Sequence, residues 1–205
     1  MNWIERMYEL KGKDLYSQNG EGLLLEYALH YCNVGCYGKS FIDIGAGDGF
    51  NLSNTRHLIN LGYKGKQVDK INGEFVTAEN VSKFYDGAAL ISIDTDGNDY
   101  WILDKMITIA KPFVIIAEFN PAFTDSRTIE YNPNHVWQGD DYYGFSFEAA
   151  KKLAEKHDYK IIYNIANMNL IIVEKDAVEG LIIPPVTYEQ NDYFKKSERT
   201  DWVWI

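Results

Sequence analysis

The sequence is poor in cysteine and has no apolar stretch long enough to cross a membrane. Its 205 residues include two cysteines, Cys32 and Cys36, with no further cysteine or nearby histidine pair to complete a zinc site. The longest apolar runs, such as PFVIIA (112–117), are far shorter than the roughly 20 residues of a membrane span. The first ten residues carry charges and lack the apolar segment of a signal peptide. We therefore expect reduced thiols, a cytoplasmic location and no membrane partner.

Basic side chains are also scarce. The chain has 20 Lys and Arg against 30 Asp and Glu, a net charge of −10. Nucleic-acid binding depends on clustered Lys and Arg, so this balance argues against nucleic acid as a partner. The apolar share of 46% and the charged share of 24% are typical of a globular protein. The length fits one domain, residues 1–205, which can bury a core without disulfides.

Strand and helix patterns alternate along the chain. Continuous apolar runs at 39–45, 89–94 and 112–119 predict strands covered on both faces. Helical patterns occupy residues 21–32, 51–62, 100–110 and 146–157, the last with Ser146 as N-cap. A hairpin over 159–175 follows. The expected fold is α/β, with a doubly wound, mostly parallel Rossmann-like sheet and an antiparallel C-terminal hairpin.

Both ends of the chain extend beyond this pattern. Residues 1–37 are expected to form an N-terminal helical segment, and residues 176–205 a C-terminal extension. The extension contains LIIPPVTYEQ (181–190) and ends in DWVWI (201–205), which are too apolar to hang free in water. We expect it to pack on the sheet or on a second copy of the chain, as a homodimer.

Polar clusters follow three of the predicted strands. They comprise residues 43–48, 94–99 and 118–120. Ligands of doubly wound sheets bind beyond the carboxyl ends of the strands. These acids are therefore expected at the rim of one crevice.

A glycine-rich turn, FIDIGAGDGF (41–50), separates a strand from a helix. It can be a tight structural turn, or a cradle where the glycines let a ligand approach the backbone. A dinucleotide is disfavoured because Asp43 and Asp48 would repel its pyrophosphate. They suit a ligand with hydroxyls and a cationic amino-acid part, such as S-adenosylmethionine.

Five stretches together resemble the FkbM-like branch of class I S-adenosylmethionine-dependent methyltransferases. They are YSQNGEG (16–22), FIDIGAGDGFNLSNT (41–55), LISIDTDGNDYWI (90–102), IIAEFNP (115–121) and YNPNHVWQGDDYYGFS (131–146). The resemblance implies a seven-stranded sheet with a reversed final strand, and transfer of a methyl group to a hydroxyl of a sugar or small natural product. It implies that the cofactor is bound by Glu21, Asp43, Gly45, Gly47, Asp48, Gly49, Asn54, Asp69 and Asp94. Gly22 stands where the family usually has an acid.

The region after the second strand is short for this family. Asp69 is the acid expected to hold the ribose hydroxyls, and only residues 70–72 separate it from GEFV (73–76). Asn72–Gly73 predicts a tight hairpin there, followed by a short helix over 78–85. Either the adenine is held by other parts of the chain or a partner subunit, or the domain has lost the cofactor and is a ligand- or protein-binding module. We favour retained binding, because crowded carboxylates in a cleft cost stability unless they are used.

The cluster DTDGND (94–99) offers more carboxylates than a helix cap requires. Asn98 or Asp99 alone could cap the following helix. Asp94 and Asp96 are expected on the same side of the strand, with Glu118 and Asn120 on the adjacent one. Carboxylate and amide oxygens suit Mg²⁺ or a similar divalent cation, which would activate a substrate hydroxyl. The alternatives are acid–base catalysis by Asp94 and Asp96 without metal, and capping alone.

A long loop without periodicity, residues 121–144, is expected to be a lid or substrate loop. Its aromatic side chains suit a sugar-like ligand, or instead pin the loop to the body of the protein. Substrate contacts are assigned to Asn120, Trp137, Tyr142 and Tyr143. His135 is a candidate general base, although a loop histidine is often a surface group.

Overall fold

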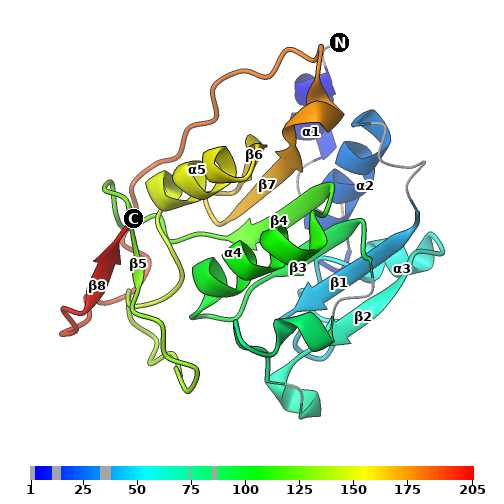
Figure 1. Cartoon of the computed structure of the whole chain (residues 1–205). Coiled ribbons are helices and arrows are strands. Elements are labelled where there is room, and N and C mark those ends of the chain that lie inside the picture. Colours follow the sequence, from blue (N-terminus) through cyan, green and yellow to red (C-terminus); the bar gives the residue numbers. More distant parts are fainter. Residues whose placement is uncertain (1–2, 11–14, 33–37, 74, 85–86) are drawn as a thin grey trace.

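The chain forms an α/β fold around one central sheet. The computed structural model describes residues 3–10, 15–32, 38–73, 75–84 and 87–205, so Cys36 lies outside the described residues. The central sheet has the strand order β2-β1-β3-β4-β7-β6, and β7 runs antiparallel to β4 and β6 on either side of it (Figure 1). Its strands are β1 (Ser40–Ile44), β2 (Lys64–Val68), β3 (Leu90–Ile93), β4 (Val114–Glu118), β6 (Tyr159–Ile165) and β7 (Asn169–Glu174). The predicted fold class is confirmed.

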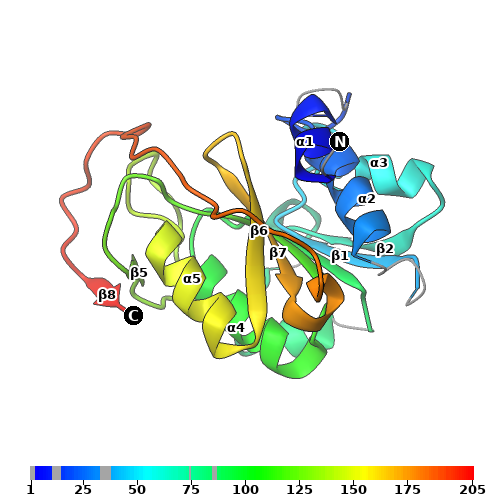
Figure 2. The ribbon, with the colours of Figure 1, turned by 90° about the horizontal axis from the view of Figure 1, so that it is seen from above.

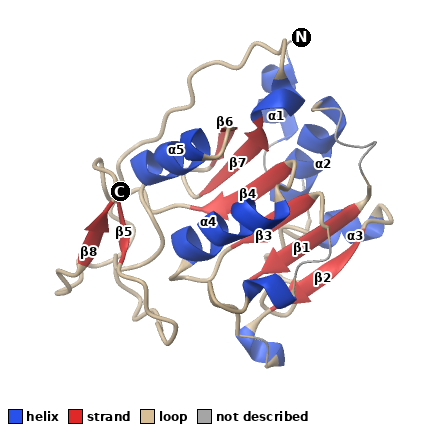
Figure 3. Cartoon of the chain, viewed as in Figure 1, coloured by secondary structure: helices blue, strands red, loops and turns tan. Residues whose placement is uncertain are grey.

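Helices cover both faces of this sheet. Helices α4 and α5 lie on one side, and α1, α2 and α3 on the other (Figures 2 and 3). The bounds are α1 (Trp3–Leu10), α2 (Glu21–Tyr31), α3 (Arg56–Asn60), α4 (Asp99–Ala110) and α5 (Phe147–Lys156). Among the described helices, none is both long and apolar enough for a membrane span.

The buried strands explain the two-sided core. Successive side chains of a strand point to opposite faces. Ile91 and Ile115 accordingly pack in the apolar cluster under α4 and α5, while Leu90 and Val114 pack in the cluster under α1, α2 and α3. Because both faces are apolar, β3 and β4 read as continuous apolar runs in the sequence.

Two local predictions are confirmed. Ser146 caps α5, its hydroxyl accepting a hydrogen bond from the amide of Ala149 at 3.2 Å. Strands β6 and β7 form the predicted hairpin, which turns through Ala166 and Asn167 at positive φ. The predicted helix over 51–62 is shorter, since only Arg56–Asn60 is helical.

The hairpin predicted at Asn72–Gly73 is wrong. Lys70–Asn72 is a 3-10 helix, closed by a hydrogen bond from the Gly73 amide to the Lys70 carbonyl at 3.1 Å. The described residues between Gly73 and β3 form no strand. The helix predicted over 78–85 is reduced to the 3-10 helix Val81–Lys83. The central sheet of the described chain therefore has six strands, not the seven that the resemblance implies.

The C-terminal extension packs on its own chain. Strand β8 (Trp202–Trp204) pairs antiparallel with β5 (Arg127–Ile129), a short strand inside the 121–144 loop. The two form a separate small sheet beside α5 (Figures 1 and 2). Tyr188 of the extension stacks on Phe147, with ring centroids 4.8 Å apart. The 121–144 loop is thus anchored at residues 127–129 and is not wholly irregular.

Candidate functional site

A cavity of about 450 Å³ lies at the carboxyl ends of β1, β2 and β3. Its walls come from the glycine turn after β1, from residues 68–71 and 75–76, from residues 94–98 and from residues 135–137. The chain runs from β1 outward to β2 and then returns to the other side of β1 to form β3. This reversal of direction is where doubly wound sheets bind ligands, and the volume suits a small molecule.

Gly45 lines the cavity at the turn after β1. Its φ is +83°, and a Cβ at this position would lie 1.6 Å from the carbonyl oxygen of Asp94. Its amide donates to the Val68 carbonyl at 2.9 Å. Only glycine allows the turn after β1 to approach the ends of β2 and β3 so closely.

Asp69 ties the second strand to this turn. Its Oδ2 accepts a hydrogen bond from the Gly47 amide at 3.0 Å, and its Oδ1 accepts one from the Ile71 amide at 2.8 Å. Gly45, Gly47, Asp69 and Asp94 line the cavity, as a cofactor role requires.

The other residues assigned to the cofactor do not line the cavity. Asp43 is buried and accepts a hydrogen bond from the Thr55 hydroxyl at 2.7 Å. Asp48 is exposed, and its carboxylate accepts hydrogen bonds from the Phe50 and Asn51 amides. Both acids therefore stabilise the turn by hydrogen bonds, Asp43 from the buried side and Asp48 from the solvent side. Similar structural roles belong to Gly49, whose carbonyl accepts from Gln67, to Asn54, which donates to the Ser92 hydroxyl, and to the fully buried Glu21.

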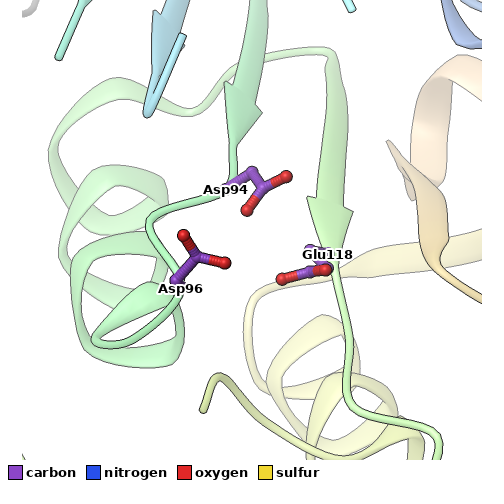
Figure 4. Close-up of side chains that lie close together, drawn as sticks. All are labelled: Asp94, Asp96 and Glu118. Carbon is purple, nitrogen blue, oxygen red and sulfur yellow. The ribbon is translucent and has the colours of Figure 1, made fainter. Parts of the chain in front are cut away.

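Three carboxylates converge beside the cavity. One oxygen each of Asp94, Asp96 and Glu118 lies within 4.8 Å of the other two. Figure 4 shows Asp94 and Asp96 on the turn after β3, facing Glu118 at the end of β4. Asp96 has a left-handed backbone, with φ at +55°. The convergence predicted from the strand ends is therefore present.

Burial and mutual repulsion change the protonation of these acids. Burial, with the charges of nearby aspartates, raises the pKa of Asp94 to about 8. Burial and the charge of Asp94 raise the pKa of Glu118 well above its usual range. Burial raises the pKa of Asp96 too, while the charge of Lys70 works against that shift. At neutral pH the cluster must either hold protons or be neutralised by a cation.

Asn120 serves the loop, not the carboxylates. Its amide nitrogen donates to the carbonyls of Asp141 (2.8 Å) and Tyr143 (3.1 Å), and its oxygen accepts from the Ala122 amide at 3.0 Å. These three bonds hold the strand end to the base of the 121–144 loop. The amide is therefore occupied and does not act as the predicted metal or substrate ligand in this arrangement.

The turn after β3 is held by side chains that do not cap α4. Asp99 is buried, and its carboxylate accepts hydrogen bonds from the Thr95 amide (2.7 Å) and the Gly97 amide (2.9 Å). Asn98 occupies the N-cap position without a capping hydrogen bond from its side chain. Capping therefore does not account for this acidic segment.

Two of the predicted loop residues line the cavity, and two do not. His135 and Trp137 reach it, whereas Tyr142 is buried with its hydroxyl donating to the Asp201 carbonyl at 3.1 Å. Tyr143 is also buried, and its ring lies 5.9 Å from that of Trp137. The two tyrosines therefore support the cavity wall without facing the cavity.

His135 presents a free ring nitrogen. Burial, with the charge of Arg199, lowers its pKa, so the imidazole is neutral at pH 7. Its Nε2 is buried and has no hydrogen-bond partner among the described residues. A neutral imidazole can accept a proton, and the His135 ring lines the cavity although Nε2 itself is buried.

Sequence reasoning missed the apolar wall opposite this histidine. Ile71, Phe75 and Val76 line the cavity, and the first two are 72% and 44% exposed. They lie in the segment read as a hairpin, so their clustering could not be inferred. Asn169 was missed as well, although it begins a strand directly opposite Glu118.

Comparison of the sequence with models of protein families and with curated proteins finds no match. A function must therefore be inferred from the cavity itself.

Proposed function

We propose that this chain is an S-adenosylmethionine-dependent methyltransferase acting on a hydroxyl of a sugar or sugar-like small molecule. The observation that carries the proposal is the cavity at the topological reversal of the sheet, bounded by a glycine turn, by Asp69 and by Asp94 and Asp96. The methyl donor has hydroxyls, an apolar ring and a cationic sulfur, and the walls offer a complement to each.

The ring and ribose would lie along the segment after β2. Asp69 lines the cavity at the carboxyl end of β2, and a carboxylate can accept hydrogen bonds from the two hydroxyls of a ribose. Ile71, Phe75 and Val76 form an apolar surface for a purine. These residues would replace the helix and strand that the resemblance implies here and that the described residues do not form.

The acidic side of the cavity favours a positively charged donor. Asp94 and Asp96 line it, and Lys70 is the only Lys or Arg among the described lining residues. A methyl donor bound there would transfer its methyl group in line to an acceptor hydroxyl and leave as a neutral thioether. His135 would accept the hydroxyl proton, which requires its ring to turn Nε2 into the cavity, and Trp137 offers an apolar face to a sugar ring.

A second candidate function is a non-catalytic ligand- or protein-binding module. It is favoured by the six-stranded sheet, which lacks the region that usually completes the adenine pocket. Binding of the methyl donor separates the two candidates.

Calorimetry with S-adenosylhomocysteine tests the proposal. Wild type should bind one equivalent, and Phe75→Ala should bind about tenfold more weakly, because a partly exposed ring that packs on the ligand contributes on the order of 1–2 kcal/mol. Ile182→Ala is the matched control, since Ile182 is 82% exposed and does not line the cavity. No binding and no thermal shift at millimolar ligand would favour the binding module.

Turnover is the second test. S-adenosylhomocysteine formation is measured by mass spectrometry with a panel of free and nucleotide-linked sugars. His135→Ala should lower kcat and leave the affinity for S-adenosylhomocysteine within about threefold. Binding without turnover on any hydroxylated acceptor would contradict the enzymatic part of the proposal.

A further inference from the structure

Asn169 has a buried amide oxygen with no partner among the described residues. The residue is 4% exposed and is the first of β7, directly opposite Glu118 of β4. Directly opposed residues of adjacent strands point to the same face of the sheet, with Cβ atoms about 4.5–5.5 Å apart. The Asn169 side chain therefore stands beside the Glu118 carboxylate.

Contacts with the N-terminal segment set the orientation of this amide. Asn169 Nδ2 donates to Glu21 Oε1 at 3.3 Å, and the same carboxylate oxygen accepts from Asn19 Nδ2 at 3.0 Å. Glu21 Oε2 accepts from the Asn19 backbone amide at 2.6 Å. Because the nitrogen of Asn169 faces Glu21, its oxygen must face away from that acid.

Glu118 also has a buried oxygen, Oε2, without a hydrogen-bond partner among the described residues. Figure 4 shows its carboxylate turned toward Asp94 and Asp96. Native proteins leave few buried polar atoms unpaired, because each costs about 1–3 kcal/mol. Two such acceptors on directly opposed residues call for a donor or a cation.

A divalent cation satisfies this set of atoms. The carboxylates offer only acceptor oxygens when ionised, and one oxygen of each lies within 4.8 Å of the others. Two oxygen ligands of one ion are separated by at most twice the ion–oxygen distance, which is about 5.2 Å for Ca²⁺ and about 4.2 Å for Mg²⁺. The spacing therefore fits Ca²⁺ directly, and a smaller ion would draw the carboxylates slightly closer together.

We propose that Asp94, Asp96, Glu118 and the amide oxygen of Asn169 bind one divalent cation. Asn169 replaces Asn120, the amide that the sequence indicated and that the structure uses to hold the loop. Glu21 and Asn19 are positioning residues that orient the Asn169 amide. The cation's part in chemistry rests on the proposed methyl transfer, where it would orient the acceptor hydroxyl. Its binding does not depend on that function.

Mn²⁺ alone, added to EDTA-treated full-length protein, is the probe. Electron paramagnetic resonance counts bound Mn²⁺, and calorimetry gives its affinity. Wild type should bind one ion, Asn169→Ala should bind at least tenfold more weakly, and Asn169→Asp should retain binding because it keeps an oxygen at the site. Asp48→Asn is the matched control, since it removes an exposed carboxylate outside the cluster and should leave the affinity within twofold.

Absence of Mn²⁺, Mg²⁺ and Ca²⁺ binding at millimolar concentration would overturn the proposal. So would wild-type affinity in a folded Asn169→Ala variant. If neither Asn169 variant folds by circular dichroism, the wild-type count and Asp96→Asn, which alters a partly exposed ligand and should weaken Mn²⁺ at least tenfold, decide the question.

Binding of S-adenosylhomocysteine is measured separately, with EDTA and with Mn²⁺. Release of Mn²⁺ when S-adenosylhomocysteine binds would mean that the acids hold the ligand's ammonium group. That outcome would support the methyltransferase and overturn a part for the cation in methyl transfer. One bound Mn²⁺ with no S-adenosylhomocysteine binding would support the metal site and contradict the methyltransferase.

Discussion

Asn98 and Asn132 are joined by two hydrogen bonds across the rim of the cavity. The Asn98 side chain donates to the Asn132 carbonyl at 2.7 Å, and its oxygen accepts from the Asn132 amide at 3.1 Å. The first residue precedes α4, and the second lies three positions before His135. This pair fixes the distance between the acidic turn and the loop that carries the candidate base.

Asn98→Ala should loosen that loop. The change removes both bonds and leaves the backbone groups of Asn132 without them, so the free energy of unfolding should fall by about 1–3 kcal/mol. Hydrogen exchange should quicken mainly in residues 131–137. Asn134→Ala alters an exposed side chain of the same loop and should change stability by less than about 0.5 kcal/mol. Equal exchange in both variants would contradict the role of the pair.

Gly97 and His135 should show strong energetic coupling. A Cβ on Gly97 would lie 2.5 Å from His135 Cδ2, while the backbone of Gly97 is outside the positive-φ region and accepts alanine. Gly97→Ala should therefore cost about 1–3 kcal/mol through crowding alone. In a His135→Ala background the same change should cost under about 0.5 kcal/mol. Additive effects in urea denaturation would show that the imidazole does not pack there.

Sequence patterns predict the buried parts of this fold well. Strands β3 and β4 are covered on both faces, so their apolar runs are unambiguous, and Ser146 caps its helix by a purely local interaction. Asp94, Asp96 and Glu118, at the ends of β3 and β4, are also brought together as expected, because parallel strands end at the same edge of a sheet.

The region after β2 could not be predicted from local signals. Asn72–Gly73 favours a hairpin, but a hairpin needs a partner strand, and β2 is an edge strand whose Lys64 and Lys66 are exposed. Charged side chains at an edge disfavour the pairing of a further strand. The chain instead crosses to the far side of β1 to begin β3. The position of β3 in the sheet therefore decides the path of the chain here, and the local turn preference of Asn72–Gly73 does not.

Which acids reach the cavity was equally hidden from the sequence. Asp43 and Asp48 flank the same glycine turn as the lining residues, yet one is buried under Thr55 and the other faces water. Asn169 and Glu118 are far apart in sequence and become neighbours through the β4–β7 pairing. Such proximity depends on the register in which β4 and β7 pair, and this register cannot be inferred from either stretch of sequence alone.

The C-terminal extension should stabilise the protein without changing its oligomeric state. Trp202 lies 4.6 Å from Phe123 and 4.7 Å from Tyr142 between ring centroids, all within one chain. Removal of residues 199–205 should lower Tm by several degrees, because these contacts and the β5–β8 pairing are lost. The molar mass from light scattering should stay that of the full-length protein. A change from dimer to monomer would indicate that the extension binds a second copy instead.

The ion pair between α4 and α5 should make stability depend on pH in the acidic range. Burial acts to raise the pKa of Asp104, but hydrogen bonds from Lys156 and His157 outweigh it and hold the pKa below its usual value of 3.8. A carboxyl group with a lowered folded pKa stabilises the fold above its unfolded pKa, and this contribution disappears as the pH falls through the folded pKa.

Asp104→Asn should therefore be less stable than wild type at pH 7, by about 0.5–1.5 kcal/mol, and the difference should shrink steadily below about pH 4. Glu148→Gln removes an exposed ion pair within α5 and should change stability by less than about 0.5 kcal/mol at either pH. Urea denaturation at pH 7 and pH 3 measures these differences. A gap between wild type and Asp104→Asn that stays constant with pH would mean that the carboxylate charge does not hold the two helices together.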